Sequence, residues 1–111
     1  MQDLHSIFLW MLIGHCLADY PLQGDFLAKA KNHRMEIGRE LAFWALPAHG
    51  LIHGGAVLAA TGSPLLCILE AVAHCVIDRA KCSGKITYGQ DQMLHVGCKA
   101  VWLGIYAGWL R

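Results

Sequence analysis

Residues 64–82 read PLLCILEAVAHCVIDRAKC, and their acidic and histidine side chains recur every four positions. Residues four apart lie on one face of an α-helix, about one turn from each other. Pro64 suits the first turn of a helix, because the N–H that it lacks would have no partner there. The stretch therefore predicts an apolar helix with Glu70, His74 and Asp78 along one line.

Three further apolar stretches predict three more helices, at Leu4–Asp19 and at about residues 39–60 and 91–110. Between the first two lies a polar segment, in which residues 25–40 (DFLAKAKNHRMEIGRE) predict a short amphipathic surface helix. The sequence has no strand-like alternation and no internal repeat. Its length suits one domain, so we expect residues 1–111 to form a single all-α, four-helix bundle.

The composition favours a membrane. Apolar residues make up 56% of the chain and charged residues 15%, whereas soluble domains typically have about 45–50% and about 25%. Runs such as IFLWMLI (7–13), PLLCIL (64–69) and VWLGIYAGWL (101–110) are apolar around the whole helix. A chain this small cannot bury four such helices completely. We therefore expect a four-helix transmembrane bundle in a lipid bilayer. A soluble bundle is the alternative, because the runs are at the short end of the about 20 residues that a span needs.

Seven of the nine basic residues flank the first and third predicted connections, which a four-span bundle places on one side of the membrane. By the positive-inside rule, both connections are cytoplasmic and both termini lie outside a bacterial inner membrane. The formal net charge of +1 gives no basic stripe for nucleic acid.

The cysteines and the first apolar stretch allow two further predictions. The five cysteines are odd in number and form no C-x-x-C motif, so we expect reduced, structural thiols. The first apolar stretch lacks the positively charged start of a secretory signal and is expected to be a retained helix.

The four-residue spacing recurs on every predicted helix, which indicates a shared metal site. Imidazole and carboxylate suit zinc, manganese or iron, and ionisable groups in a bilayer are costly enough to be functional by default. We predict one or two divalent transition-metal ions, zinc first, held by His15, Asp19, His49, His53, His74, Asp78 and His95. Glu70 and Asp91 are the candidate catalytic acid or base.

Each pair also has a structural explanation when it is taken alone. The glycines beside His49 and His53 could reflect close helix packing, and Asp91 could be a first-turn acid favoured by the helix dipole. Those explanations would have to hold independently on four helices, so we favour the shared site.

Polar residues near the predicted site indicate an anionic substrate at the cytoplasmic face. The candidates for substrate binding are Gln23, Asp25, Lys29, Arg79, Lys81 and Lys99. Attraction of lysines to lipid headgroups is the alternative for the loop residues. Lys99 lies inside an apolar helix, where it could also snorkel or pair with Asp91 or Glu70.

Four strings, HCLADYPLQGDFLAKAK (15–31), HGLIHGG (49–55), EAVAHCVIDRAKCSGK (70–85) and DQMLHVGCKAVW (91–102), resemble a family of small integral membrane proteins of bacteria and phages. That family carries only a domain-of-unknown-function label, so the resemblance implies a helical membrane domain and no activity. The chain is more loosely similar to membrane-bound metal-dependent hydrolases, an analogy without a motif match.

Together these observations favour a membrane-embedded metal-dependent hydrolase that acts on a phosphorylated or lipid-like substrate. One alternative is a small proton or divalent-metal transporter or channel subunit that uses the same cluster. Another is a non-catalytic, holin-like phage membrane protein. The sequence leaves open the substrate, the metal and whether the chain forms a homo-oligomer.

Overall fold

The computed structural model describes residues 2–111, which form helices and connecting turns without any strand. The helices are α1 (Leu4–Asp19), α2 (Gly24–Ala30), α3 (Glu36–Thr61), α4 (Pro64–Cys82) and α5 (Tyr88–Ile105). A π-helical turn, η1 (Tyr106–Leu110), continues α5. The predicted all-α class is confirmed, and so are the bounds predicted for α1 and α4.

Local side-chain hydrogen bonds explain where these helices begin. The Asp3 carboxylate accepts from the Ser6 N–H at the start of α1, and the Ser63 hydroxyl accepts from the Leu66 N–H at the start of α4. At α5, Thr87 and Gln90 exchange hydrogen bonds between side chain and backbone. Each contact satisfies an N–H that has no partner within the helix.

The predicted single surface helix over residues 25–40 is wrong in its extent. The chain ends α2 at Ala30, turns, and begins α3 at Glu36, three residues before the expected start of the second long helix. Asn32 makes this turn, because its side chain accepts the Arg34 N–H at 2.9 Å. Gly38 packs directly against the Asn32 carbonyl, where a larger residue would not fit.

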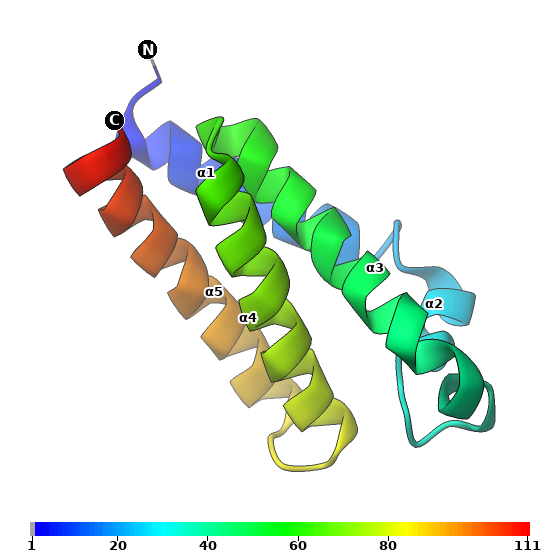
Figure 1. Ribbon diagram of the computed structural model, residues 1–111. Coiled ribbons are helices and arrows are strands. Elements are labelled where there is room, and N and C mark those ends of the chain that lie inside the picture. Colours follow the sequence, from blue (N-terminus) through cyan, green and yellow to red (C-terminus); the bar gives the residue numbers. More distant parts are fainter. Residues whose placement is uncertain (1) are drawn as a thin grey trace.

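The four long helices lie side by side in an elongated bundle of 46 × 22 × 21 Å (Figure 1). Both termini lie at one end, which we call the terminal end. The short helix α2 and the turn between α4 and α5 lie at the other, which we call the loop end (Figure 1). The first and third connections therefore lie together at the end opposite the termini, as the four-helix arrangement predicts.

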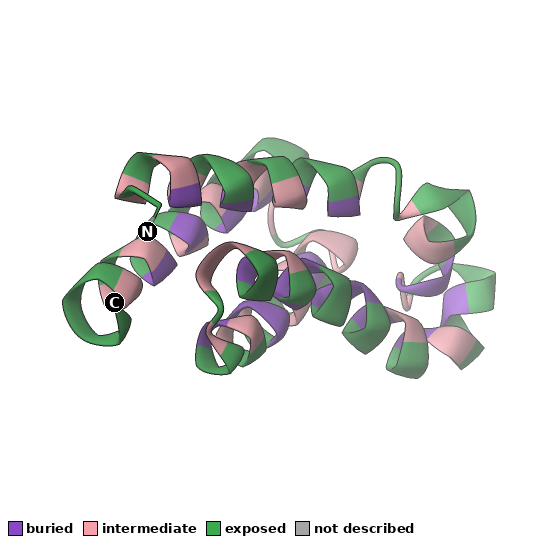
Figure 2. Ribbon diagram, turned by 90° about the horizontal axis from the view of Figure 1, so that it is seen from above, coloured by how far each residue is buried: buried purple, intermediate pink, exposed green. Residues whose placement is uncertain are grey.

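The interior of the bundle changes character along its length. Buried residues lie where the helices face one another (Figure 2). An apolar core occupies the bundle toward the terminal end and consists of Ile7, Met11, Val57, Leu66 and Trp102. The remaining interior positions are largely polar, and they include five histidines.

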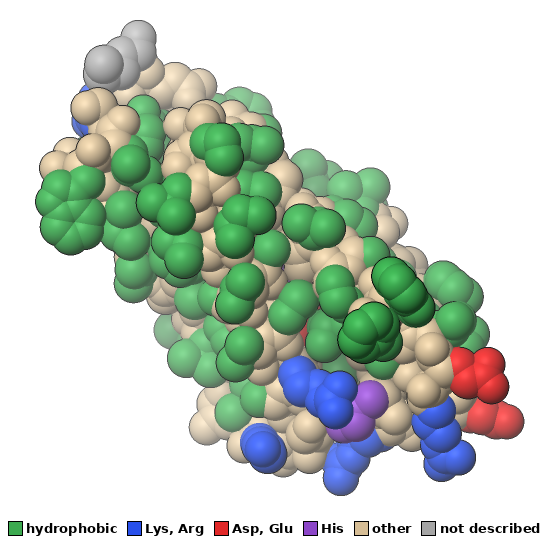
Figure 3. All heavy atoms as spheres, in the orientation of Figure 1, with side chains coloured by type: hydrophobic (Ala, Val, Ile, Leu, Met, Phe, Trp, Pro, Cys, Tyr) green, Lys and Arg blue, Asp and Glu red, His purple; other side chains and the backbone are tan. Residues whose placement is uncertain are grey.

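The outer surface is rich in large apolar side chains (Figure 3). Phe43, Trp44 and Trp109 are 77%, 74% and 83% exposed. Lysine and arginine side chains gather at the loop end in the same view (Figure 3). All five cysteines are free thiols, as predicted.

Helix length alone does not establish the predicted four-span arrangement. Within residues 2–111, α3 alone is long and apolar enough to cross a membrane, and α1 is apolar but shorter. Charged residues such as Asp78 and Lys81 make α4 too polar to be a candidate membrane span by composition alone. A single helix of this kind also occurs as the core helix of soluble proteins.

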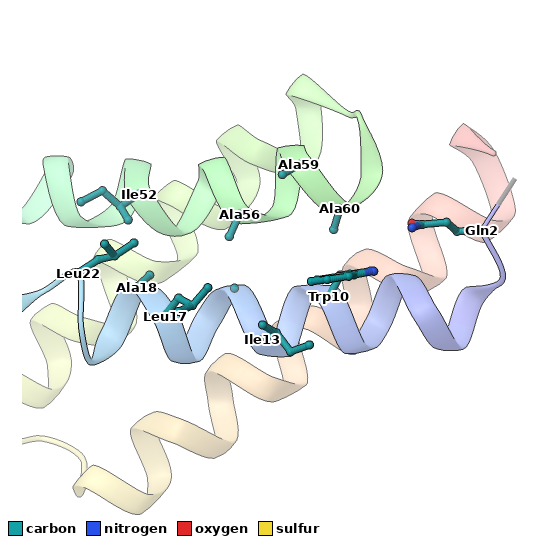
Figure 4. Close-up of a pocket in the computed structure, with 11 residues that line it drawn as sticks. Gln2, Trp10, Ile13, Leu17, Ala18, Leu22, Ile52, Ala56, Ala59 and Ala60 are labelled. Carbon is teal, nitrogen blue, oxygen red and sulfur yellow. The ribbon is translucent and has the colours of Figure 1, made fainter.

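An apolar groove with a volume of about 390 Å³ runs between α1 and α3 (Figure 4). Trp10, Ile13 and Leu17 line it from α1, and Ile52 and Ala56 line it from α3. None of the five histidines lines this groove, so it is separate from the polar interior described next.

Candidate metal centre

Five histidines from four helices meet inside the bundle and form what we call the histidine cluster: His15, His49, His53, His74 and His95. Each is at most 4% exposed. The rings of His53 and His74 stack with centroids 3.6 Å apart, and those of His74 and His95 stack at 4.1 Å. Rings this close cannot all carry a positive charge, so the cluster suits neutral imidazoles that face a cation.

Asp19 supplies the carboxylate at the centre of the cluster. Its Oδ1 lies 2.8 Å from His53 Nε2, 3.3 Å from His49 Nε2 and 3.9 Å from His74 Nε2. Four ligands placed tetrahedrally at about 2.0–2.1 Å from an ion are about 3.3 Å from one another. The three distances from Asp19 Oδ1 bracket that value, and the ligand atoms of the four residues all lie within 4.8 Å of one another. The four side chains therefore surround one point, at a spacing somewhat wider than that of a bound zinc site.

Glycines in α3 bring the two histidine-bearing helices close enough for this geometry. A methyl group added at Gly54 would lie 2.6 Å from the Cys67 carbonyl oxygen of α4, and one added at Gly50 would lie 2.9 Å from the Ala71 carbonyl oxygen. Small residues four apart allow two helix backbones to approach closely. The two explanations offered for this segment are therefore compatible. The glycines allow close packing of α3 against α4, and that packing brings the neighbouring histidines together.

Unpaired polar atoms test whether the residues fit a metal ion. Both ring nitrogens of His49 and the Nδ1 atoms of His53 and His74 are buried without a hydrogen-bond partner among residues 2–111. A buried polar atom without a partner costs about 1–3 kcal/mol. His49 Nε2 is the one of these atoms that faces Asp19, with 3.3 Å between it and Oδ1. A divalent cation beside Asp19 would satisfy this nitrogen, so the donor set fits a metal.

A second polar layer lies between α1 and α5. Asp91 Oδ1 is 3.2 Å from His95 Nε2, and His15 Nε2 is 3.4 Å from Asp19 Oδ2. The Gln92 amide donates to Asp19 Oδ2 at 3.1 Å and to Asp91 Oδ2 at 3.0 Å. Gln92 thus connects the two predicted carboxylates, and the structure brings Asp91 to the cluster as predicted.

Glu70 is fully buried and both of its carboxylate oxygens have partners. Lys99 donates to Oε1, and Trp102 Nε1 donates to Oε2 at 2.7 Å. His74 Nδ1 faces the same carboxylate at 3.8 Å. Lys99, predicted to bind substrate, instead forms the ion pair that the sequence offered as an alternative, and Glu70 lies behind His74 and away from the loop end.

Asp78, predicted as a ligand, lies at the edge of the cluster and is surrounded by lysines. Lys31 Nζ is 2.7 Å from Oδ2, and Lys81 Nζ is 3.3 Å from Oδ1, whereas His49 Nε2 is 3.8 Å away. Lys31, at the end of α2, is almost completely buried. Asp78 therefore anchors the turn after α2 to the site.

The remaining residues predicted for substrate binding are distributed unevenly. Gln23 donates to the Asp19 carbonyl at 3.3 Å, and Lys81 reaches Asp91 at 4.0 Å, so both border the cluster. Asp25 and Lys29 form an exposed ion pair with each other at 3.0 Å on α2. Arg79 is exposed on α4.

Three side chains of the site were missed by sequence reasoning: Gln92, Lys31 and Trp102. Gln92 precedes His95 by three positions and so faces the same side of α5, a signal that could have identified it. Lys31 and Trp102 act across helices, and nothing in their local sequence distinguishes them from a loop lysine and an apolar core residue.

Comparison with known proteins assigns the family. Residues 7–107 match the family model described as "Protein of unknown function (DUF3307)", and the chain belongs to this family. A search of curated proteins and a search of solved structures gave no match. The family resemblance seen in the sequence is thus confirmed, whereas the membrane character and the likeness to hydrolases gain no support from these comparisons.

Proposed function

We propose that this protein is a membrane-embedded, metal-dependent hydrolase whose ion is held by Asp19, His49, His53 and His74. One observation carries the proposal: one ligand atom from each of the four residues lies within 4.8 Å of the others, inside the bundle. Zinc fits this mixture of imidazole and carboxylate best, and manganese and iron are the alternatives.

The chemistry follows from the type of site. A bound divalent ion acidifies a coordinated water and polarises the substrate oxygen that it contacts. Imidazole and carboxylate without cysteine are the ligand types of catalytic zinc sites more than of structural ones. Because four protein ligands fill a tetrahedral ion, a coordinated water would require a fifth position, to which zinc can expand. Hydrolysis is therefore the reaction class that the donor set supports best.

The protein groups beside the ion point to an anionic substrate. Lys81 is 28% exposed and lies between Asp78 and Asp91, at the loop end of the cluster. An ammonium group there can pair with a phosphate or carboxylate that approaches the ion. Of the two carboxylates predicted to be catalytic, Asp91 is the better placed. It lies beside Lys81, and its Oδ1 contacts His95 Nε2 at 3.2 Å, whereas Lys99 and Trp102 engage both oxygens of Glu70.

The exposed surface supports a lipid environment and a lipid-like substrate. Large apolar side chains on α1, α3, α4 and α5 face outward, among them Trp10, Phe43, Val76 and Met93. In water such a surface would favour aggregation or a partner, whereas hydrocarbon covers it at no cost. The polar loop end then lies at the membrane surface, within reach of lipid headgroups.

Metal analysis and a hydrolase assay test this function together. The full chain, purified in detergent without chelator, should contain a stoichiometric transition metal and should hydrolyse a phosphate ester or a phospholipid from a mixed panel. His53→Ala should lose both properties, and His5→Ala, in a fully exposed histidine of α1, should keep both. Tightly bound metal without hydrolysis, together with metal flux across loaded vesicles, would instead support the transporter alternative.

A further inference from the structure

We infer that the site holds two ions and that Asp19 is their shared ligand, an inference that rests on the proposed function. The two oxygens of this carboxylate face different sets of imidazoles. Oδ1 faces His53, His49 and His74, while Oδ2 is 3.4 Å from His15 Nε2. Carboxylates that present one oxygen to each of two donor sets are suited to bridge two cations.

The second donor set comes from α1 and α5 alone. α1 contributes His15 and Asp19, and α5 contributes Asp91 and His95. The two helices run in opposite directions, so the order histidine–aspartate on α1 lies beside the order aspartate–histidine on α5 (Figure 1). The rings of His15 and His95 are 5.2 Å apart between centroids, and His95 Nε2 is 3.2 Å from Asp91 Oδ1.

Gln92 marks the place where the second ion would bind. Its amide nitrogen lies 3.1 Å from Asp19 Oδ2 and 3.0 Å from Asp91 Oδ2, so two carboxylates converge on one weak donor. Its Oε1 lies 3.1 Å from His15 Nε2. A neutral amide does not balance two buried carboxylates, whereas a divalent cation at this place does.

Asp91 itself adds an independent indication. It is 1% exposed, and its Oδ1 accepts no hydrogen bond within residues 2–111. Lys81 reaches only the other oxygen, Oδ2, at 4.0 Å. His95 Nε2 lies 3.2 Å from this oxygen, so the carboxylate and the imidazole are about as far apart as two ligands of one ion.

Another group of potential ligands, Glu70, His74 and His95, has its ligand atoms within 4.8 Å of one another, but its contacts suit a second ion less well. Lys99 and Trp102 already neutralise and hydrogen-bond Glu70. His74 directs Nε2 toward Asp19 and Nδ1 toward Glu70. This is the arrangement by which a carboxylate orients a ligating histidine without binding the metal itself.

Manganese loading of the full chain in detergent tests the two-ion site. Metal-free protein is titrated with Mn²⁺, and bound manganese is measured by elemental analysis and by low-temperature electron paramagnetic resonance. We expect about two ions per chain with an exchange-coupled spectrum, because two-metal sites hold their ions about 3.5–4 Å apart. Asp91→Asn should reduce the content to about one ion per chain with the six-line spectrum of an isolated ion.

The outcomes separate this inference from the proposed function. About one ion per chain in the unmodified protein, with a six-line spectrum, would overturn the second ion and leave the first. No bound manganese, zinc or iron at all would overturn both. The number of manganese ions bound by the unmodified chain decides the question even if Asp91→Asn fails to fold. The control variant His5→Ala should bind as many ions as the unmodified chain.

Discussion

Asp19 and His53 are 34 positions apart in the sequence, yet Asp19 Oδ1 lies 2.8 Å from His53 Nε2. The contact joins the last turn of α1 to the middle of α3, across a segment that includes α2 and two turns. Packing does not require either group at an apolar helix interface. The contact is therefore best understood as part of a binding site, and several expectations depend on it.

Removal of His53 should disrupt metal binding more than it disrupts the fold. His53→Ala takes away one of four ligands, so affinity should fall by more than the about 10–100-fold that loss of a group supporting a ligand costs. Competition with a chelator of known affinity measures this. His5→Ala is the matched control, and equal affinities of the two variants would contradict the site.

The glycines of α3 should differ sharply in their tolerance of a methyl group. Gly54→Ala places a Cβ 2.6 Å from the Cys67 carbonyl oxygen and should cost about 1–3 kcal/mol of stability as the helices separate. It should also weaken metal binding, because His53 and His74 lie on the separated helices. Gly55→Ala has open space around its Cβ and should be neutral or stabilising by up to about 1 kcal/mol.

Thermal unfolding in detergent, with and without metal, compares the two glycine variants. A similar gain of stability in both variants would mean that helix propensity, and not the contact between α3 and α4, controls this position.

The Lys99–Glu70 pair should be sensitive to the loss of one partner. Both side chains are 1% exposed, so Lys99→Met leaves an uncompensated buried carboxylate and should cost about 3–5 kcal/mol. Adding Glu70→Gln removes that charge and retains an acceptor for Trp102 Nε1. The double variant should therefore unfold at a higher temperature than Lys99→Met alone, and a double variant that is less stable than the single one would contradict this account.

Acidification should release the metal. Imidazole in water takes up a proton near pH 6.5, and a protonated ring cannot bind an ion. Metal affinity should therefore be high at pH 7.5 and fall steadily toward pH 5, as protons compete for the ring nitrogens of the cluster. Equilibrium dialysis across this range checks the direction, and an affinity that rises on acidification would exclude histidine ligands.

The orientation of the bundle can be tested with cysteine labelling in intact cells. A cysteine placed at Ser83, in the turn after α4, should react only from the cytoplasmic side. One placed at Ser63, in the turn between α3 and α4, should react from the opposite side. Reaction of both positions from the same side would contradict a four-span bundle.

Much of the fold could be predicted from the sequence because its signals are local. Pro64 and Ser63 define the start of α4, and Tyr20-Pro21 follow the end of α1 at Asp19. The break between α2 and α3 could not be predicted in the same way. It depends on contact of Gly38 with the Asn32 carbonyl, which exists only after the chain has turned.

The site, like the fold, has features that local sequence predicts and others that depend on contacts between distant segments. The four-residue spacing identified every histidine of the cluster, because side chains at that spacing share a helix face. It could not distinguish the carboxylates that face imidazoles from those neutralised by lysine. Asp19 and Asp78 look equivalent in sequence, but Lys31 reaches Asp78 from a distant turn.

The far side of the cluster has a consequence for the choice between catalysis and transport. Beyond His74, toward the termini, lie the Glu70–Lys99 pair, then Trp102 and an apolar core that includes Met11 and Leu66. Within residues 2–111, an ion that enters the cluster from the loop end therefore has no polar path onward to the terminal end. To carry it onward, the protein would have to break a buried ion pair and open a packed core in every cycle. A site that is closed on its inner side suits a molecule that enters, reacts and leaves from the loop end.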